Sequence, residues 1–379
     1  MRAPQLGLYV HLPWCERKCP YCDFNSHEAL EIPETAYLDA LIADLREEAK
    51  GQRCDIQTVF IGGGTPSLFS VNAIKRLMDA VRSIGLAADA EVTMEANPGS
   101  TEAARLEGYA DAGVTRFSLG IQSFDDACLM ALGRIHDSKM GREAVAAARD
   151  SGASSYNIDL MHGLPEQNLE LGLNDIRSAL SLSPPHLSWY QLTIEPNTRF
   201  YSNPPRLPAE SILGSLEEEG ARVLRAAGYH RYEISAWAQP GQECQHNLNY
   251  WRFGDYMAIG AGAHGKLSTE SGEIFRYAKT RQPEDYLAAG GIKRKAFRAL
   301  DEADRQGEFV LNALRLSEGF SLDLFEARTG LNASRLDTTV RKLVDRGLVQ
   351  HNQEHIRTTD LGLRFLDDVV AAFFAEGSA

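Results

Sequence analysis

Three of the six cysteines in this chain, Cys15, Cys19 and Cys22, lie close together with the spacing C-x-x-x-C-x-x-C. Cys thiolates hold iron–sulfur clusters, and a cubane cluster has four irons to ligate. Three thiolates therefore leave one iron without a protein ligand, as a catalytic metal centre leaves a position open for substrate. A zinc site completed by a distant Cys or His, and ordinary core cysteines, stay open as alternatives. Zinc knuckles usually pair their cysteines as C-x-x-C units, so the spacing favours the cluster.

Composition limits the classes of function and the compartment. The 379 residues carry a formal net charge of −13, which argues against a protein whose main task is to bind nucleic acid. No run of about 18 apolar residues predicts a membrane span. The N-terminal residues lack the apolar core of a signal peptide, so we expect a cytoplasmic protein. Disulfides are rare there, which favours metal or redox chemistry for clustered cysteines.

Short β-rich runs alternate with amphipathic helical patterns over the first two-thirds of the chain. The expected strands are Leu6–Leu12, Thr58–Gly63, Glu91–Asn97, Arg116–Gln122, Tyr156–Gly163 and His186–Leu192. Expected helices begin at Glu34 and near Val71, Thr101, Lys139 and Leu169, and another ends at Gly228. Regular alternation predicts a parallel sheet, either doubly wound or a TIM-like barrel. Polar or glycine-rich residues end almost every strand, and a barrel gathers strand ends at its active rim, so we expect an α/β fold with a TIM-like, partial β/α barrel.

The chain divides into three parts. We expect the barrel core in residues 1–235, an irregular connecting region with a glycine-rich loop in 236–300, and a small α+β domain in 301–379. In the last part, helical patterns cover Asp304–Ser317, Leu322–Thr329 and Asn332–Arg346, two β-like runs follow, and a final helix reaches Phe374. Three helices and a two-stranded wing are typical of a winged helix. Its third helix mixes basic and acidic residues, which favours a lid or docking domain over DNA binding.

The segment YVHLPWCERKCPYCDF resembles the radical S-adenosylmethionine (radical SAM) superfamily, whose motif places an aromatic residue before the third Cys, here Tyr21. The resemblance implies a [4Fe–4S] cluster on the three cysteines, with SAM chelating the open iron. It also implies that Tyr9, Gly63 and Glu95 contact this SAM, Glu95 through the ribose hydroxyls. Without the resemblance, GGGTPS from Gly62 would be a tight βα turn and Glu95 a capping or surface group.

Gln122, Arg134 and Asp159 form a further set, spaced twelve and then twenty-five residues apart. These spacings are similar to those of the porphyrin-oxidising branch of the superfamily. The resemblance implies that the three residues contact a second SAM molecule, together with Tyr21, Gly64 and Thr65. The alternatives are that Gln122 caps a strand and that Arg134 and Asp159 form an ion pair.

The resemblance covers nearly the whole chain and is closest to the oxygen-independent coproporphyrinogen III oxidase group. The oxidase has a fourth Cys two residues after the third, where this chain has Phe24. It also has an N-terminal extension, whereas only fourteen residues precede Cys15 here. The segment HNLNYW, from His246 to Trp251, matches a motif associated with a heme-chaperone branch of the group. This branch is therefore the closer match.

The HNLNYW motif implies that His246, Tyr250 and Trp251 bind heme. A neutral imidazole is a common axial ligand of heme iron, and flat aromatic groups pack on a macrocycle. Alternatively, His246 satisfies loop backbone groups and Trp251 belongs to the core. Cys244 and His264 are further candidate ligands.

We therefore expect a heme-binding protein that delivers heme to acceptor proteins such as membrane-associated respiratory subunits. It would carry a [4Fe–4S] cluster and SAM, insert into no membrane and bind no nucleic acid, and the resemblance implies a homodimer. The oxidase reaction, which removes a hydrogen atom from each of two propionates and releases carbon dioxide, is the alternative. A tRNA- or cofactor-modifying radical enzyme and a structural cluster protein that does not use SAM are weaker interpretations.

Overall fold

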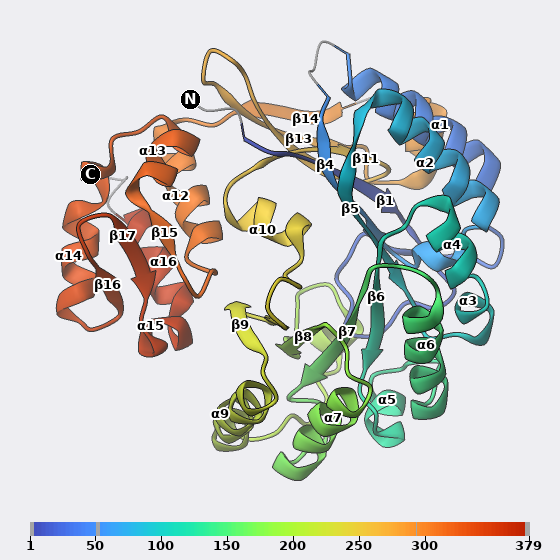
Figure 1. The fold of residues 1–379 in the computed structure, drawn as a ribbon, viewed down its shortest axis with the longest axis horizontal. Coiled ribbons are helices and arrows are strands. Elements are labelled where there is room, and N and C mark those ends of the chain that lie inside the picture. The colour runs from blue at the N-terminus through green and yellow to red at the C-terminus, as the bar shows by residue number, and fades with distance from the viewer. Residues whose placement is uncertain (1–3, 51–53, 293, 376–379) are drawn as a thin grey trace.

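A single curved sheet organises most of the computed structural model, which describes residues 4–50, 54–292 and 294–375 (Figure 1). Its parallel strands are β1 (Leu6–Leu12), β4 (Ile56–Gly63), β5 (Leu86–Ala96), β6 (Arg116–Gln122), β7 (Ser155–His162), β8 (His186–Gln191) and β11 (Asp255–Ile259). Its outer strands are β9 (His230–Glu233), β10 (Ala236–Ala238), β12 (His264–Ser268), β13 (Ile274–Lys279) and β14 (Arg294–Ala299). The order across the 12-stranded sheet is β14-β13-β12-β11-β1-β4-β5-β6-β7-β8-β10-β9. No pairing in the described residues joins β14 to β9, so the barrel is partial, as expected.

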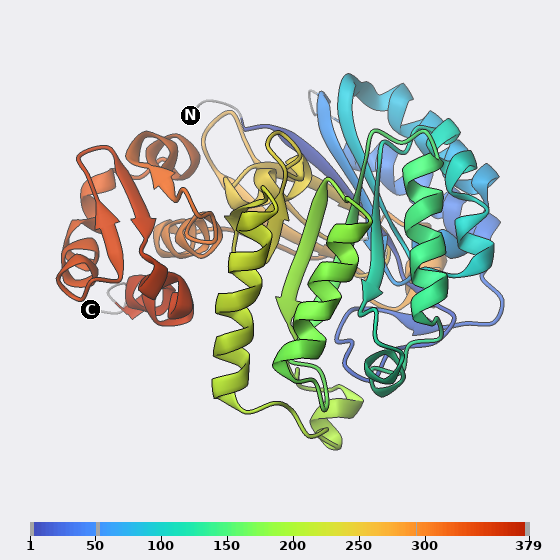
Figure 2. The ribbon, with the colours of Figure 1, turned by 60° about the horizontal axis from the view of Figure 1, so that its bottom comes forward.

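Helices cover the outer side of this sheet (Figures 1 and 2). The covering helices are α1 (Glu34–Glu48), α2 (Val71–Gly85), α3 (Ser100–Ala103), α4 (Leu106–Ala112), α6 (Ser138–Asp150), α7 (Leu169–Ser181) and α9 (Glu210–Ala226). Shorter elements are η1 (Pro66–Leu68), α5 (Asp126–Ala131), α8 (Arg199–Ser202), α10 (Gln245–Trp251) and α11 (Pro283–Ala288). The side chains of Ser70, Asp137 and Asn168 accept a backbone N–H and so begin α2, α6 and α7. All six strands expected from the sequence are confirmed.

The expectation of an irregular region before residue 300 is wrong. Strand β11 lies parallel to β1, with Leu6 opposite Asp255, and β12, β13 and β14 extend the sheet as antiparallel neighbours. The signal was weak because β11 has only five residues. The glycines that follow it, Gly260 and Gly262, have φ values of 103° and 82°, so they form a tight connection between two strands.

The C-terminal part has its own hydrophobic cluster, which also includes Phe253 and Ile274. Its elements are α12 (Glu302–Ala313), β15 (Phe320–Ser321), α13 (Leu322–Thr329), η2 (Ala333–Leu336), α14 (Asp337–Asp345), β16 (Val349–His351), β17 (His355–Thr358), α15 (Asp360–Arg364) and α16 (Leu366–Ala375). Helix α12 begins earlier than expected because Asp301 and Asp304 form a capping box. The wing has three strands, in the order β15-β17-β16, where two were expected.

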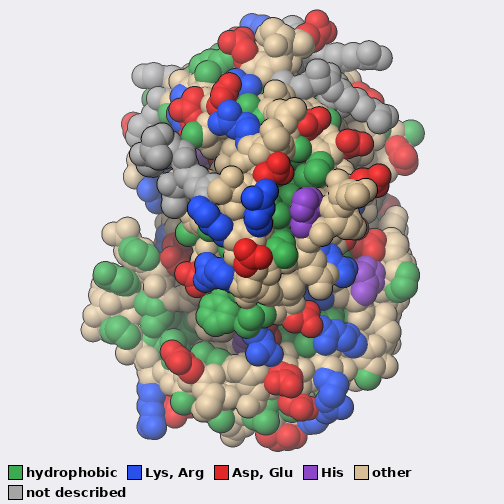
Figure 3. Space-filling view, turned by 90° about the vertical axis from the view of Figure 1, so that its left-hand side faces the viewer, with side chains coloured by type: hydrophobic (Ala, Val, Ile, Leu, Met, Phe, Trp, Pro, Cys, Tyr) green, Lys and Arg blue, Asp and Glu red, His purple; other side chains and the backbone are tan. Residues whose placement is uncertain are grey.

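Two further differences concern the helices of this part. The third expected helix is divided into η2, which Asn332 caps, and α14, and the final helix is divided into α15 and α16. Gly330 and Gly347 end helices with positive φ, as expected. Lys and Arg side chains are interspersed with Asp and Glu over the face of the molecule in Figure 3. Within the described residues, no helix is both long and apolar enough to cross a bilayer.

Candidate functional site

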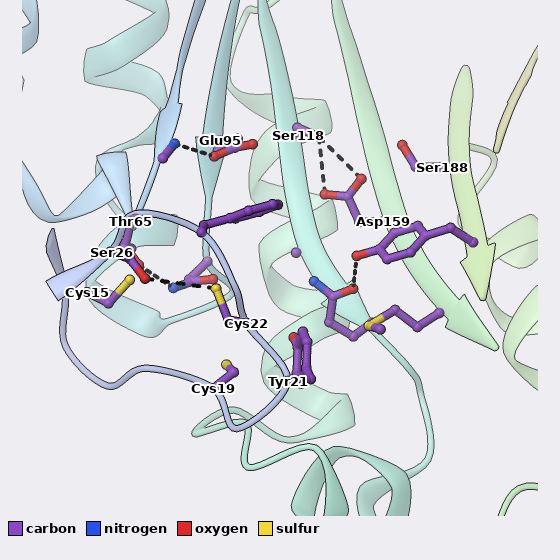
Figure 4. Close-up of a pocket in the computed structure, with 18 of the residues that line it drawn as sticks. Cys15, Cys19, Tyr21, Cys22, Ser26, Thr65, Glu95, Ser118, Asp159 and Ser188 are labelled. Carbon is purple, nitrogen blue, oxygen red and sulfur yellow. Dashed lines mark hydrogen bonds between the residues drawn. The ribbon is translucent and has the colours of Figure 1, made fainter. Parts of the chain in front are cut away.

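A cavity of about 470 Å³ lies between the carboxyl ends of the parallel strands and the loop that follows β1 (Figure 4). The sulfurs of Cys15, Cys19 and Cys22 lie at one end of the cavity, while Asp159 and Ser188 lie at the other. The structure therefore brings the cysteines and the polar strand residues to one site.

Short pairings at its base hold the cysteine loop in place. Strand β2 (Trp14–Cys15) pairs with β3 (His27–Glu28), so the two ends of the loop are joined. Within the loop, Lys18 Nζ donates to the backbone oxygens of Phe24 at 2.9 Å and Ser26 at 3.2 Å. The cysteines are free of disulfides. A closed, internally bonded loop thus presents three thiols to the cavity.

The thiols suit a cluster better than a single ion. Among the described residues, no three Cys, His, Asp or Glu side chains converge tightly enough to hold one metal ion. A cubane places each thiolate on a different iron, so its ligands stand farther apart than those of zinc. Burial raises the pKa of the Cys15 and Cys22 thiols, and Arg134 Nη1 donates to Cys19 Sγ at 3.5 Å. The residues fit a [4Fe–4S] cluster, and the zinc alternative loses support.

The glycine motif brings the end of β4 against the cysteine loop. Gly64 N donates to Leu12 O at 2.8 Å and Thr65 N donates to Trp14 O at 2.7 Å. A Cβ atom on Gly64 would collide with the backbone of Trp14, and Gly63 has a φ of +120°. The motif is thus a tight βα turn in any event, and the turn also forms one wall of the cavity.

Glu95 lies against this turn and accepts a hydrogen bond from Gly63 N at 3.0 Å. Burial and, secondarily, the charge of Asp159 raise the pKa of Glu95 to about 7. Burial also raises the pKa of Asp159, against the hydrogen bonds that it accepts from Asn157 and Ser118. Two buried carboxyl groups in one cavity, one of which raises the pKa of the other, favour a cationic ligand. The sulfonium and ammonium groups of SAM have that character, so the donor set fits SAM.

Neither alternative for Gln122, Arg134 and Asp159 holds. Arg134 Nη2 donates to Asn97 Oδ1 at 2.8 Å and to Gly120 O at 2.9 Å, and it forms no ion pair with Asp159. Asp159 instead accepts from Ser118 (Figure 4) and from Asn157 Nδ2. Gln122 has a φ of 69°, and its side chain accepts from Tyr190 at 2.9 Å instead of capping the strand. Strained backbone of this kind is common at functional sites.

The same cavity includes Tyr21, Gly63, Gly64 and Thr65, whereas Tyr9 lines a neighbouring one. Sequence reasoning missed several of its polar residues, which are Asn97, Arg116, Ser118, Asn157, Ser188 and Tyr190. A signal for them existed, because side chains two residues apart on a strand share one face. Every second residue of β6 lines the cavity: Arg116, Ser118, Gly120 and Gln122. Only Gln122 was predicted from the sequence.

The neighbouring cavity, of about 660 Å³, shares Phe24, Phe60, Gly63 and Glu95 with the first. Its other residues are Tyr9, His11, Asn25, Tyr250, Tyr256, Gly262, His264, Ala278, Lys279 and Arg281. The two cavities therefore adjoin.

Helix α10 carries the HNLNYW motif, and only Tyr250 of the three predicted heme residues reaches a cavity wall beside the cluster site. His246 is 0% exposed, and its ring nitrogens contact Thr58 Oγ1 and Tyr250 OH, each at 2.9 Å. Trp251 lies under the guanidinium of Arg315 at 4.3 Å, on the side of the C-terminal part. The motif thus forms a packed and largely hydrogen-bonded unit.

Comparison with known proteins identifies relatives over the full length. The radical SAM superfamily model matches residues 9–176, and the HemN C-terminal domain model matches residues 300–365. The chain is similar to the heme chaperone HemW of Escherichia coli, with 47% identity over 99% of this chain and 100% of that protein. HemW of Haemophilus influenzae is 46% identical over 99% of both chains. In structure, the chain resembles coproporphyrinogen III oxidase (HemN) from Escherichia coli, with a TM-score of 0.83, 22% identity and coverage of 99% of this chain and 91% of that one, a likeness of fold.

Proposed function

This chain belongs to the heme chaperone HemW family of radical SAM proteins, and from that premise we propose that it binds heme and passes heme to acceptor proteins. Full-length identity to proteins of that name carries the proposal. The aromatic cavity beside the cysteine loop supports it, because this cavity offers room for a flat apolar ligand. Acceptors among respiratory subunits, a homodimer and a cytoplasmic location stay predictions.

Cys15, Cys19 and Cys22 would hold the [4Fe–4S] cluster in this proposal. Bound there, the cluster and SAM supply one-electron radical chemistry. The chain's own groups position and shield these cofactors. The turn from Gly63 closes one wall, Glu95 would accept the ribose hydroxyls, and Arg134 would place its charge beside the cluster thiolates.

A second SAM would lie toward Gln122, Arg134 and Asp159. Its support is the row of polar side chains that these residues share with Ser118 and Tyr190. A titration of the cluster-loaded protein with SAM tests this part, since two bound equivalents are expected and one would contradict it.

The oxidase reaction is the alternative function. Phe24, in the place of the oxidase's additional Cys, is 61% exposed and offers no thiol to the cavity. The deciding experiment supplies the anaerobic, cluster-loaded protein with coproporphyrinogen III, SAM and a reductant. We expect no protoporphyrinogen, and its formation would overturn a function limited to heme delivery.

Heme transfer is tested with the same preparation. The heme-loaded protein is mixed with an apo-cytochrome, and the two are separated. We expect heme to appear on the acceptor faster than from free hemin. Heme that stays entirely with this protein would contradict delivery.

A further inference from the structure

We propose that heme lies in the second cavity and that His264, the first residue of β12, is the axial ligand of its iron in place of His246. The proposal rests on the proposed function, because it takes heme as the cargo. It identifies the ligand by comparing the hydrogen-bond partners and the exposure of each imidazole near the cavities.

The other histidines of this region are already engaged or closed off. Both ring nitrogens of His246 have hydrogen-bond partners, as described above. His11 Nδ1 contacts Tyr9 OH at 2.9 Å and its Nε2 contacts Asn25 O at 2.9 Å. His27 Nε2 has no partner, but this atom is buried and the residue lines a different cavity. None of the three offers an accessible lone pair to the second cavity.

His264 differs in each respect. It is exposed, it lines the second cavity, and no hydrogen bond to its ring is found among the described residues. Partial burial, then the charges of Arg276 and Arg281, lower its pKa. The ring is therefore neutral near pH 7, which is the state that binds iron.

The surroundings suit the rest of a heme. Phe24, Phe60, Tyr250 and Tyr256 supply aromatic surface along the cavity. At its rim, Arg281 uses Nε to bond Asn25 Oδ1 at 3.1 Å, so its two Nη groups remain for a propionate carboxylate. A volume of about 660 Å³ lies in the range of small-molecule and cofactor sites.

The wall that the two cavities share places the proposed heme site next to the cluster site. Phe24 and Phe60 line both cavities, so a heme in the second one would adjoin the cluster site without occupying it. The residue that replaces the oxidase's additional Cys would then contact the macrocycle.

Hemin is titrated into the cluster-loaded full chain and followed by difference absorbance, for wild type, His264→Ala and the matched control His351→Ala. His351 is likewise exposed, but it lies on β16 in the C-terminal part. We expect His264→Ala to bind hemin at least roughly tenfold more weakly, with a shifted Soret band, and added imidazole to restore the wild-type spectrum. His351→Ala should titrate like wild type.

An unchanged spectrum and affinity in His264→Ala would overturn this assignment while leaving heme binding intact. Absence of binding by wild type would instead refute the proposed function. Thermal unfolding of each variant separates loss of the ligand from loss of the fold, and little change is expected because His264 is exposed.

Discussion

The cysteine loop and helix α10 both carry short sequence motifs, yet they differ in how far their polar atoms are already hydrogen-bonded. The loop presents thiols with few partners to an open cavity, whereas α10 uses both nitrogens of His246 in buried hydrogen bonds. A ligand must find free donors or acceptors, so an imidazole whose two nitrogens are both engaged acts first on packing. The comparison separates the binding and the supporting parts of one molecule.

Removing a cluster thiol should have the largest effect. We expect Cys19→Ala to lose the broad visible iron–sulfur absorbance and most of the bound iron, because the loop has only three thiols. Folding should be retained, since Cys19 is only partly buried. Cys54→Ala, another partly buried free cysteine, is the control. Iron content equal to wild type in Cys19→Ala would refute the cluster assignment.

His246→Ala should damage the fold and not the cargo site. The change leaves Thr58 and Tyr250 without partners in a buried region and opens a cavity, so we expect a loss of about 3–4 kcal/mol in the free energy of unfolding. Denaturant unfolding measures it. If His246→Ala keeps wild-type stability but loses the heme spectrum, the contrast between the two regions collapses.

Glu95→Gln should weaken SAM binding by about 1–3 kcal/mol, because the amide accepts the ribose hydroxyls less well. Without SAM it should stabilise the protein at high pH. Burial raises the pKa of Glu95 to about 7, so wild type loses stability as pH rises from 4.5 through that value. The variant avoids this loss. If the free energy of unfolding varies with pH in the same way for the two proteins from pH 4 to 8, the raised pKa of Glu95 is contradicted.

Cys244→Ala should have the smallest effect. The Cys244 thiol is 0% exposed, donates to Glu91 Oε1 at 3.4 Å, and has its pKa raised to about 12 by burial. We expect a loss of about 1 kcal/mol in unfolding free energy and an unchanged heme spectrum. A changed Soret band would identify this thiol as an iron ligand and weaken the comparison.

The sequence was informative where each residue's neighbours along the chain decide the outcome. Cys15, Cys19 and Cys22 share one loop, and the parallel strands read as β-rich runs because both of their faces are buried. It failed where partners are distant. The hydrogen bond of His246 depends on Thr58 in strand β4, far away in the sequence, and the place of β11 depends on β1. The polar residues that line the cavity with Asp159 could have been predicted by following every second position along each strand, since those side chains share one face.

The pairing of β11 with β1 also has a consequence for folding during synthesis on the ribosome. Strand β1, which leads into the cysteine loop, stays an unpaired edge on one side until a partner roughly 250 residues later has been synthesised. Exposed strand edges invite aggregation during that interval. We expect ribosome-bound chains that stop before Asp255 to expose the cysteine loop to protease and to need chaperone protection. The strand that leads into the cysteine loop would then gain its second neighbour only late in translation.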